Sequence, residues 1–242
     1  MALTSPRHVT SGYFRNHLYV LLGLNVLVCL VAFSGSDYVL LAPLLVAAVA
    51  SYVGAACWLY EKSLAGIISL VIVAVADLVG AWLQLFAPVA NVVTTSSQAA
   101  PVSPIATLLL ALDPLLAGLL LGSTAAAMFL GHWYLNTPTM ELAPLNRLLN
   151  WMALAVALRA VACAVGLGLL LYHGDALPNL YLLALRWIAG IVGMVGVIWM
   201  TKETLKIPNT QSATGILYVG VILTFLGELM SQLLSQQSAF PV

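Results

Sequence analysis

Residues 63–87 read SLAGIISLVIVAVADLVGAWLQLFA, an almost unbroken apolar stretch in which Asp77 is the only charged residue. A helix of about 20 such residues is long enough to cross a hydrocarbon core of about 30 Å. The stretch lacks the alternation of apolar and polar residues that strands of a membrane barrel show. It therefore predicts a transmembrane helix with one acidic side chain near its middle.

The rest of the chain has the same character. Of its 242 residues, 62% are hydrophobic and only 7% are charged, with eight basic and eight acidic residues. A soluble domain contains about 25% charged residues, and a soluble surface this apolar would far exceed the patches that monomers tolerate. The composition excludes a soluble enzyme, a nucleic-acid-binding protein with a basic stripe, a disordered chain and a disulfide scaffold.

Seven stretches in all are long and apolar enough to span a membrane. We predict an all-α integral membrane protein with a single domain over residues 1–242 and spans at about 14–34, 38–60, 63–87, 105–133, 147–172, 179–201 and 212–235. Most connections are short and contain proline, glycine or charged residues. The longest, from Pro88 to Pro104, is predicted to be a surface loop, with a lid or a partner-docking loop as the alternative.

The distribution of basic residues predicts the orientation. If the chain crosses the membrane seven times, six cations fall on the side of the N-terminus and none on the other side. These six are Arg7, Arg15, Lys62, Arg147, Lys202 and Lys206. Because cytoplasmic loops are enriched in Lys and Arg, we expect a cytoplasmic N-terminus and an outer C-terminus in a bacterial inner membrane.

Five ionisable residues fall inside the predicted spans: Asp77, Asp113, Arg159, Arg186 and Glu228. Each is costly in a bilayer unless it faces the protein and finds a partner. Asp77 and Arg159 lie near the middle of their spans and are expected to pair. The other three belong to the outer half of the membrane, so Arg186 is expected to contact Asp113 or Glu228. Gly190 and Gly193 share a helix face with Arg186 and should let another helix approach closely.

These charges have two interpretations. They could serve only to fix the packing of the helices, since buried ion pairs act as interhelical contacts. Alternatively, they could form a polar cavity that is open to the outside and suited to proton transfer or to a quinone headgroup. The sequence leaves both interpretations open.

His17 and His132 fall at the same membrane level on different spans, which makes them candidate axial ligands of a b-type haem. The alternative is that His132 is an interfacial residue of an aromatic belt. Three cysteines, Cys29, Cys57 and Cys163, lie inside apolar runs without metal-binding spacing and are expected to pack as small hydrophobic residues.

Three functions fit these features. The first is a membrane-embedded subunit of an electron-transfer complex of the respiratory type that contacts quinone or haem b and passes protons. The second is a small transporter or channel, and the third is a structural or assembly subunit without chemistry. An independent enzyme is not expected, because the sequence offers no nucleophile–base pair and no metal triad. The expected partners are the lipid bilayer and other subunits of a membrane complex, and not nucleic acid.

Overall fold

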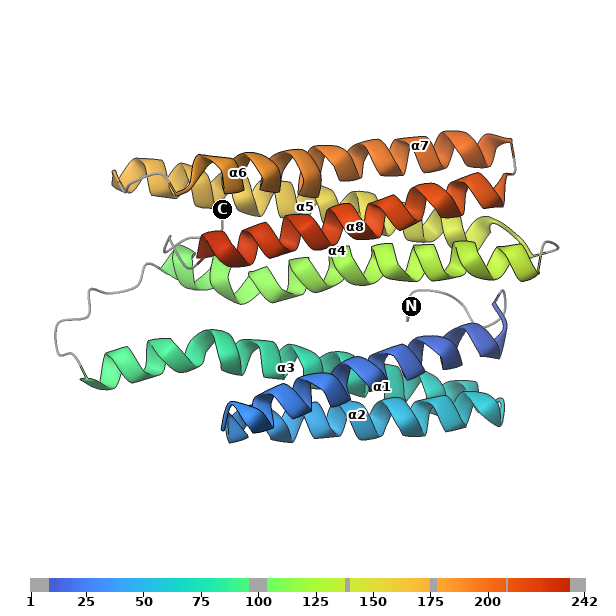
Figure 1. The fold of residues 1–242 in the computed structure, drawn as a ribbon, viewed down its shortest axis with the longest axis horizontal. Coiled ribbons are helices and arrows are strands. Elements are labelled where there is room, and N and C mark those ends of the chain that lie inside the picture. Colours follow the sequence, from blue (N-terminus) through green and yellow to red (C-terminus); the bar gives the residue numbers. More distant parts are fainter. Residues whose placement is uncertain (1–8, 96–103, 138–139, 175–177, 208, 236–242) are drawn as a thin grey trace. The chain divides into compact units, whose positions relative to one another are not determined.

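The computed structural model describes residues 9–95, 104–137, 140–174, 178–207 and 209–235, with the backbone alone over residues 87–95. Over these ranges the chain is helical and contains no strand. The elements are α1 (Ser11–Ser34), α2 (Tyr38–Leu59), α3 (Ser63–Thr95), α4 (Pro104–Asn136), α5 (Ala143–His173), α6 (Leu180–Trp187), η1 (Ile188–Gly193), α7 (Met194–Lys206) and α8 (Thr210–Ser235) (Figure 1).

Seven helical segments are long and apolar enough to cross a membrane, which confirms the predicted multi-pass helical protein. The sixth segment, Leu180–Lys206, combines α6, α7 and the short π-helix η1 between them. A π-turn was not predicted from the sequence. It inserts extra backbone into the helix and so changes the angular relation between the residues before and after it.

Several helices are longer than the apolar runs that predicted them. Helix α5 begins at Ala143, before the predicted start at residue 147, because Pro144 occupies its first turn, where proline is tolerated. Helix α7 continues to Lys206, beyond the predicted end at residue 201. The apolar run measures the hydrocarbon core, whereas the helix extends into the polar interface, where charged side chains are no obstacle.

The predicted loop from Pro88 to Pro104 is wrong over its first half. The backbone of α3 remains helical to Thr95. Proline is tolerated in membrane helices, so Pro88 does not end this one. Residues 96–103 lie outside the described residues, and the lid and docking-loop alternatives therefore remain hypotheses.

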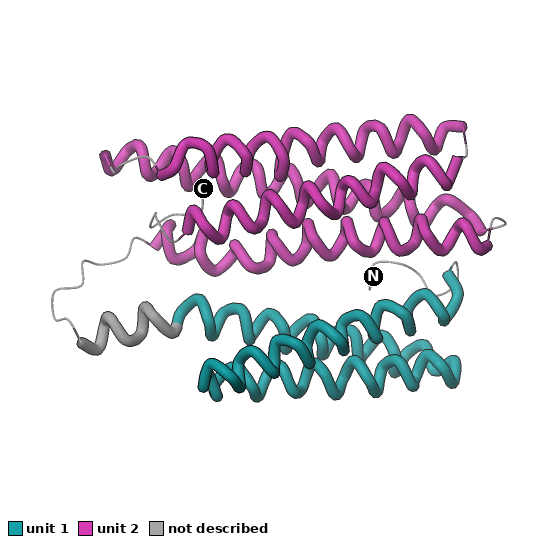
Figure 2. The backbone as a smooth tube through the Cα atoms, in the orientation of Figure 1, with its two compact units in different colours: residues 1–101 teal, residues 102–242 magenta. Residues whose placement is uncertain are grey.

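The chain divides into two compact units, residues 1–101 and 102–242 (Figure 2). In the first unit α1 packs against α2, and α2 packs against α3. Phe14 of α1 stacks on Trp58 of α2, with ring centroids 4.2 Å apart and planes 8° apart. The prediction of a single domain over the whole chain stays a prediction.

The second unit is a bundle of four spans. Helix α4 packs against α5 and α8, and the span made of α6, η1 and α7 packs against α8 and α5. At one end of this bundle Ala106, Leu170, Leu183 and Leu234 form an apolar cluster drawn from α4, α5, α6 and α8. The four spans therefore converge on a shared interior, which is where the candidate site lies.

Within each unit the basic residues of the connections gather at one end. Arg15 lies in the second turn of α1, and Lys62 lies in the turn that joins α2 to α3. In the second unit Lys202 donates a hydrogen bond to Asn150 Oδ1 at 2.8 Å, which ties the end of α7 to the start of α5. This arrangement is the one that the predicted cation distribution requires of each unit.

Candidate functional site: a buried ion-pair cluster

Four charged side chains meet inside the second unit. Asp113 comes from α4, Arg159 from α5, Arg186 from α6 and Glu228 from α8. Both arginines are completely buried, and the side chains of Asp113 and Glu228 are 15% and 11% exposed. We call these four residues the charge cluster.

Arg159 is the centre of the charge cluster. Its Nε donates to Glu228 Oε1 at 3.2 Å and its Nη2 to Glu228 Oε2 at 2.6 Å, which makes the pair bidentate. Its Nη1 donates to Asp113 Oδ1, and its Nη2 also reaches Ser231 Oγ at 3.2 Å. Bidentate arginine–carboxylate pairs combine charge with a fixed geometry and are the strongest of the hydrogen-bonded ion pairs. Arg159 therefore holds α4, α5 and α8 together at one point.

Arg186 approaches the same carboxylate from the other side. Its Nη1 donates to Glu228 Oε1 at 3.1 Å, and its Nη2 donates to Cys163 Sγ at 3.4 Å. Its Nε is buried and has no hydrogen-bond partner in the part of the chain that the structure describes. Glu228 thus accepts three charge-assisted hydrogen bonds from two guanidinium groups, whereas Asp113 accepts one from Arg159.

Gly190 and Gly193 lie where η1 packs closely against α8. A Cβ atom added to Gly190 would lie 2.9 Å from Gly227 Cα and 2.9 Å from Arg186 Nη1. A Cβ atom at Gly193 would lie 3.0 Å from a methyl group of Leu223. The π-helix and α8 therefore touch backbone to backbone beside the ion pairs, as helices with small residues at their crossing do. The predicted close approach at Gly190 and Gly193 is confirmed.

The charge cluster is electrically balanced, with two cations and two anions. Burial of an isolated charge is very costly, and a balanced, hydrogen-bonded group avoids most of that cost. Asp113 and Glu228 keep the small exposure that remains. Glu228 is thus held between the two arginines, whereas Asp113 contacts Arg159 alone and is the more exposed of the two carboxylates.

The structure bears on the predicted pairings in different ways. The expected contact of Arg186 with Asp113 or Glu228 is confirmed by its ion pair with Glu228. The expected pair of Arg159 with Asp77 would join the two units and stays a prediction; within its own unit Arg159 binds Asp113 and Glu228, a pairing that was not predicted. Both partners lie on helices that face Arg159 within the bundle, whereas equal depth in the membrane says nothing about the direction of a side chain.

Two further side chains, those of Cys163 and Ser231, accept hydrogen bonds from the arginines of the charge cluster. Cys163 was expected only to pack, but it also accepts a hydrogen bond from Arg186. Its position four residues after Arg159 places both on one face of α5, which is the signal that could have identified it. Ser231 lies three residues after Glu228 and is 4% exposed, consistent with the shared face that the spacing implies.

Asp77 belongs to the first unit, where it lies on α3 and is hydrogen-bonded by the side chain of Asn25 of α1. Its Oδ1 atom is buried without a hydrogen-bond partner among the described residues. Gln84, two turns further along the same helix, is exposed. Within its own unit Asp77 therefore has Asn25 as its hydrogen-bonding neighbour.

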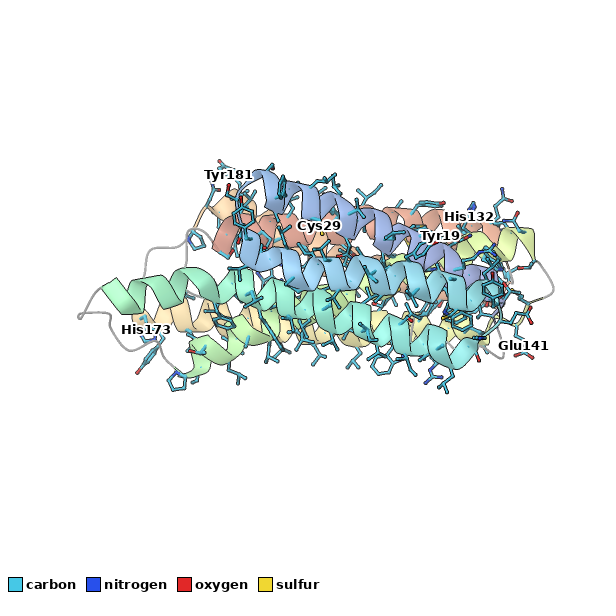
Figure 3. The ribbon with its side chains drawn as sticks, turned by 90° about the horizontal axis from the view of Figure 1, so that it is seen from below. Tyr19, Cys29, His132, Glu141, His173 and Tyr181 are labelled. Atoms are coloured by element: carbon cyan, nitrogen blue, oxygen red, sulfur yellow. The ribbon has the colours of Figure 1, made fainter. Side chains whose placement is uncertain are left out.

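The two candidate haem ligands lie in different units and different surroundings. His17 is 9% exposed, and its Nδ1 lies 2.9 Å from the carbonyl oxygen of Tyr13. A hydrogen bond from one ring nitrogen to a backbone carbonyl is common in histidines that ligate a metal. His132 is exposed near the end of α4, at the opposite end of the second unit from His173 (Figure 3). The environment of His17 fits a ligand, and that of His132 fits an interfacial residue.

Neither a cluster of metal-binding side chains among the described residues nor a similar protein indicates a function. Over the residues whose placement is described, no three or more His, Cys, Asp or Glu side chains gather closely enough to hold a metal ion. The comparisons with known proteins find no matching family model, no matching curated protein and no matching solved structure. The argument about function therefore rests on the charge cluster and its surroundings.

Proposed function

We propose that the chain is a membrane-embedded subunit of an electron-transfer complex of the respiratory type, in which the charge cluster passes protons next to a quinone or a haem. The observation that supports this proposal is the buried, balanced group of Asp113, Arg159, Arg186 and Glu228. Ionisable residues inside membrane spans commonly belong to proton relays and ligand sites. A proton added to this neutral group leaves one positive charge, which an electron arriving on a neighbouring cofactor would balance.

The proposed setting is the bacterial inner membrane, with the N-terminus in the cytoplasm and the C-terminus outside. The support is the absence of Lys and Arg from the connections at the other side, together with their gathering at one end of each unit. In this orientation Arg186 lies six residues, about 9 Å along the helix, from the outer start of its span. The charge cluster would then open to the outer half of the membrane.

The test is to purify the tagged full-length chain from its native membranes with its partners. We expect redox-active subunits, and bound quinone or haem, to copurify with it. The Asp113→Asn variant keeps the size of the side chain and should assemble, yet lose proton uptake that is coupled to quinone reduction. A matched Ser231→Ala variant removes one hydrogen bond and no charge, and it should keep that activity. Copurification with no redox group at all would contradict the proposal.

Haem binding forms a separate part of the proposal. If His17 and His132 hold a b-type haem, protein made with ample haem should show a reduced-minus-oxidised difference spectrum. Either histidine replaced by alanine should abolish that spectrum. A colourless wild-type protein, or a spectrum unaffected by both substitutions, would remove the haem and leave quinone as the redox partner.

A structural or assembly subunit is the second candidate, and one observation favours it. The hydrogen bonds of Arg159 join three helices, and the Gly190–Gly227 contact joins a fourth element at the same level, so the charge cluster also acts as a packing point. The paired Arg186→Leu and Glu228→Leu variant separates the two functions. If the refolded double variant leaves its host complex fully active, the charges serve packing alone.

A further inference from the structure

Asp77 lies deep inside the apolar part of the first unit. Its span runs over Ser63–Phe86, so Asp77 is about 21 Å along the helix from Ser63 and about 14 Å from Phe86. The side chain is partly buried, and one oxygen, Oδ1, has no hydrogen-bond partner among the described residues. A carboxylate at this depth needs a counter-charge, a set of donors or a proton.

Over the described residues of this unit, no counter-charge on α1, α2 or α3 is close enough to serve. On α3 itself Asp77 is the only charged residue, and α2 has none over Tyr38–Leu59. On α1 the titratable residues nearest to Asn25 are Cys29, a neutral thiol, and Tyr19 and His17, which lie towards the start of the helix. Arg15 is ten residues, about 15 Å along the helix, from Asn25.

The arginines of the other spans are already balanced. Arg159 binds Asp113 and Glu228, and Arg186 binds Glu228, so two cations match two anions. Among Asp77, Asp113 and Glu228, the three acidic residues deep within the described spans, Asp77 is the one that these ion pairs leave out.

The hydrogen bonds around Asp77 are too few to hold an ionised carboxylate in an apolar layer. The side chain of Asn25, which is 5% exposed, hydrogen-bonds the carboxyl, while its Nδ2 also donates to Leu21 O at 3.1 Å. One amide is too few donors for a buried carboxylate, which has about four acceptor positions. A protonated carboxyl accepts from Asn25 through one oxygen and leaves no net charge in the apolar layer.

We propose that Asp77 and Asn25 form a second intramembrane proton-binding site, in which Asp77 carries a proton at rest and can release it. The site lies in the first unit and does not depend on the function proposed for the charge cluster. Asn25 holds the carboxyl in place through its amide, and Asp77 binds the proton. The ligand is a proton and not Na⁺, because Na⁺ binding would call for more oxygen ligands than this pair supplies.

Dicyclohexylcarbodiimide tests the proposal, because it reacts with protonated carboxyl groups in apolar surroundings. The carboxyl proton moves to a carbodiimide nitrogen, the carboxyl oxygen bonds to the central carbon, and an acyl shift gives a stable N-acylurea. Applied to full-length protein in its membranes, the reagent should modify Asp77 and leave Asp113, Glu228 and the exposed Asp37 unmodified, as read by peptide mass spectrometry. The modification should decline as pH rises and disappear in Asp77→Asn.

A second measurement covers the case in which the reagent does not reach the site. Infrared spectra of the wild type at neutral pH should contain a protonated-carboxyl stretch that Asp77→Asn removes and Asp37→Asn does not. Because asparagine is a neutral isostere, the Asp77→Asn chain should fold as well as the wild type. Absence of both the labelled peptide and the infrared band would overturn the proposal. So would protection of Asp77 by Na⁺ but not by K⁺, which would assign the site to a metal cation.

Discussion

Removal of Glu228 should destabilise the protein more than removal of Arg186, although the two residues form one ion pair. In Glu228→Leu, two buried guanidinium groups lose three charge-assisted hydrogen bonds, and Asp113 alone balances them. Breaking a buried ion pair by deleting one partner costs about 3–5 kcal/mol. In Arg186→Leu, Glu228 loses one such bond and keeps its bidentate pair with Arg159, so a loss of about 1.5–3 kcal/mol is expected.

The double variant Arg186→Leu with Glu228→Leu should be more stable than Glu228→Leu alone. It leaves Arg159 and Asp113, one cation and one anion that are already in contact, so the remaining charge is balanced. Substitution of a whole buried ion pair by apolar residues is often neutral or stabilising. The coupling energy between the two substitutions should therefore be about 0.5–3 kcal/mol, in the direction of rescue.

A second neutral double variant provides the control. Arg159→Leu with Glu228→Leu also removes one charge of each sign, but Arg186 and Asp113 have no ion pair with each other among the described residues. This variant should show little rescue relative to Glu228→Leu. Ser231→Ala, which removes one uncharged contact, should cost only about 0.6 kcal/mol, the average for hydrogen bonds between membrane helices.

The assay is reversible unfolding of the full-length chain in mixed micelles, followed by far-ultraviolet circular dichroism under identical conditions for every variant. Additive losses in the Arg186–Glu228 double variant would refute the reasoning from charge balance. Equal rescue in both double variants would show that net charge alone matters and that the geometry of the contacts does not.

Three further predictions concern packing and orientation. Gly227→Ala should cost about 1–3 kcal/mol of unfolding free energy because its Cβ has no room, whereas Gly215→Ala on the same helix meets nothing within 4 Å and should be tolerated. Deletion of Val192 from η1 should restore an α-helix and turn the preceding residues by about 100° about the helix axis. In the same unfolding assay, this deletion should destabilise the fold as strongly as loss of the Arg186–Glu228 contact. A cysteine at Tyr181, which is 86% exposed, should react with an impermeant thiol reagent in intact cells, and one at Ile207, which is 79% exposed, should not; the reverse pattern would invert the proposed orientation.

The number of spans could be predicted from the sequence because it depends on the length and composition of each segment. The stretch around Asp77 is apolar enough to span a membrane whichever helices it packs against. Helix ends were less accurate for a physical reason, since α5 and α7 continue into the interface, where polar residues are compatible with a helix. Composition detects the lipid-facing layer and not the last turns beyond it.

The partners of the intramembrane charges could be predicted only in part. Depth along a span follows from counting residues, and it correctly placed Arg186 beside Glu228. Pairing also depends on the direction in which each helix face points, and depth contains no information about that direction. This is why the partners that Arg159 has within its own unit, Asp113 and Glu228, were not predicted.

The π-turn and the glycines explain why charge and packing cannot be separated by single substitutions in this bundle. Arg186 immediately precedes Trp187 and η1, and its Nη1 lies against the backbone contact between Gly190 and Gly227. A substitution that separates Gly190 from Gly227 also moves the guanidinium away from Glu228. Conversely, loss of the guanidinium leaves a void beside the contact between the two backbones. A loss of activity in a single variant at Arg186, Gly190 or Gly227 is therefore consistent with either role. The Arg186→Leu with Glu228→Leu variant distinguishes them, because it keeps the preformed Arg159–Asp113 ion pair and, once refolded, shows whether activity needs the two missing charges.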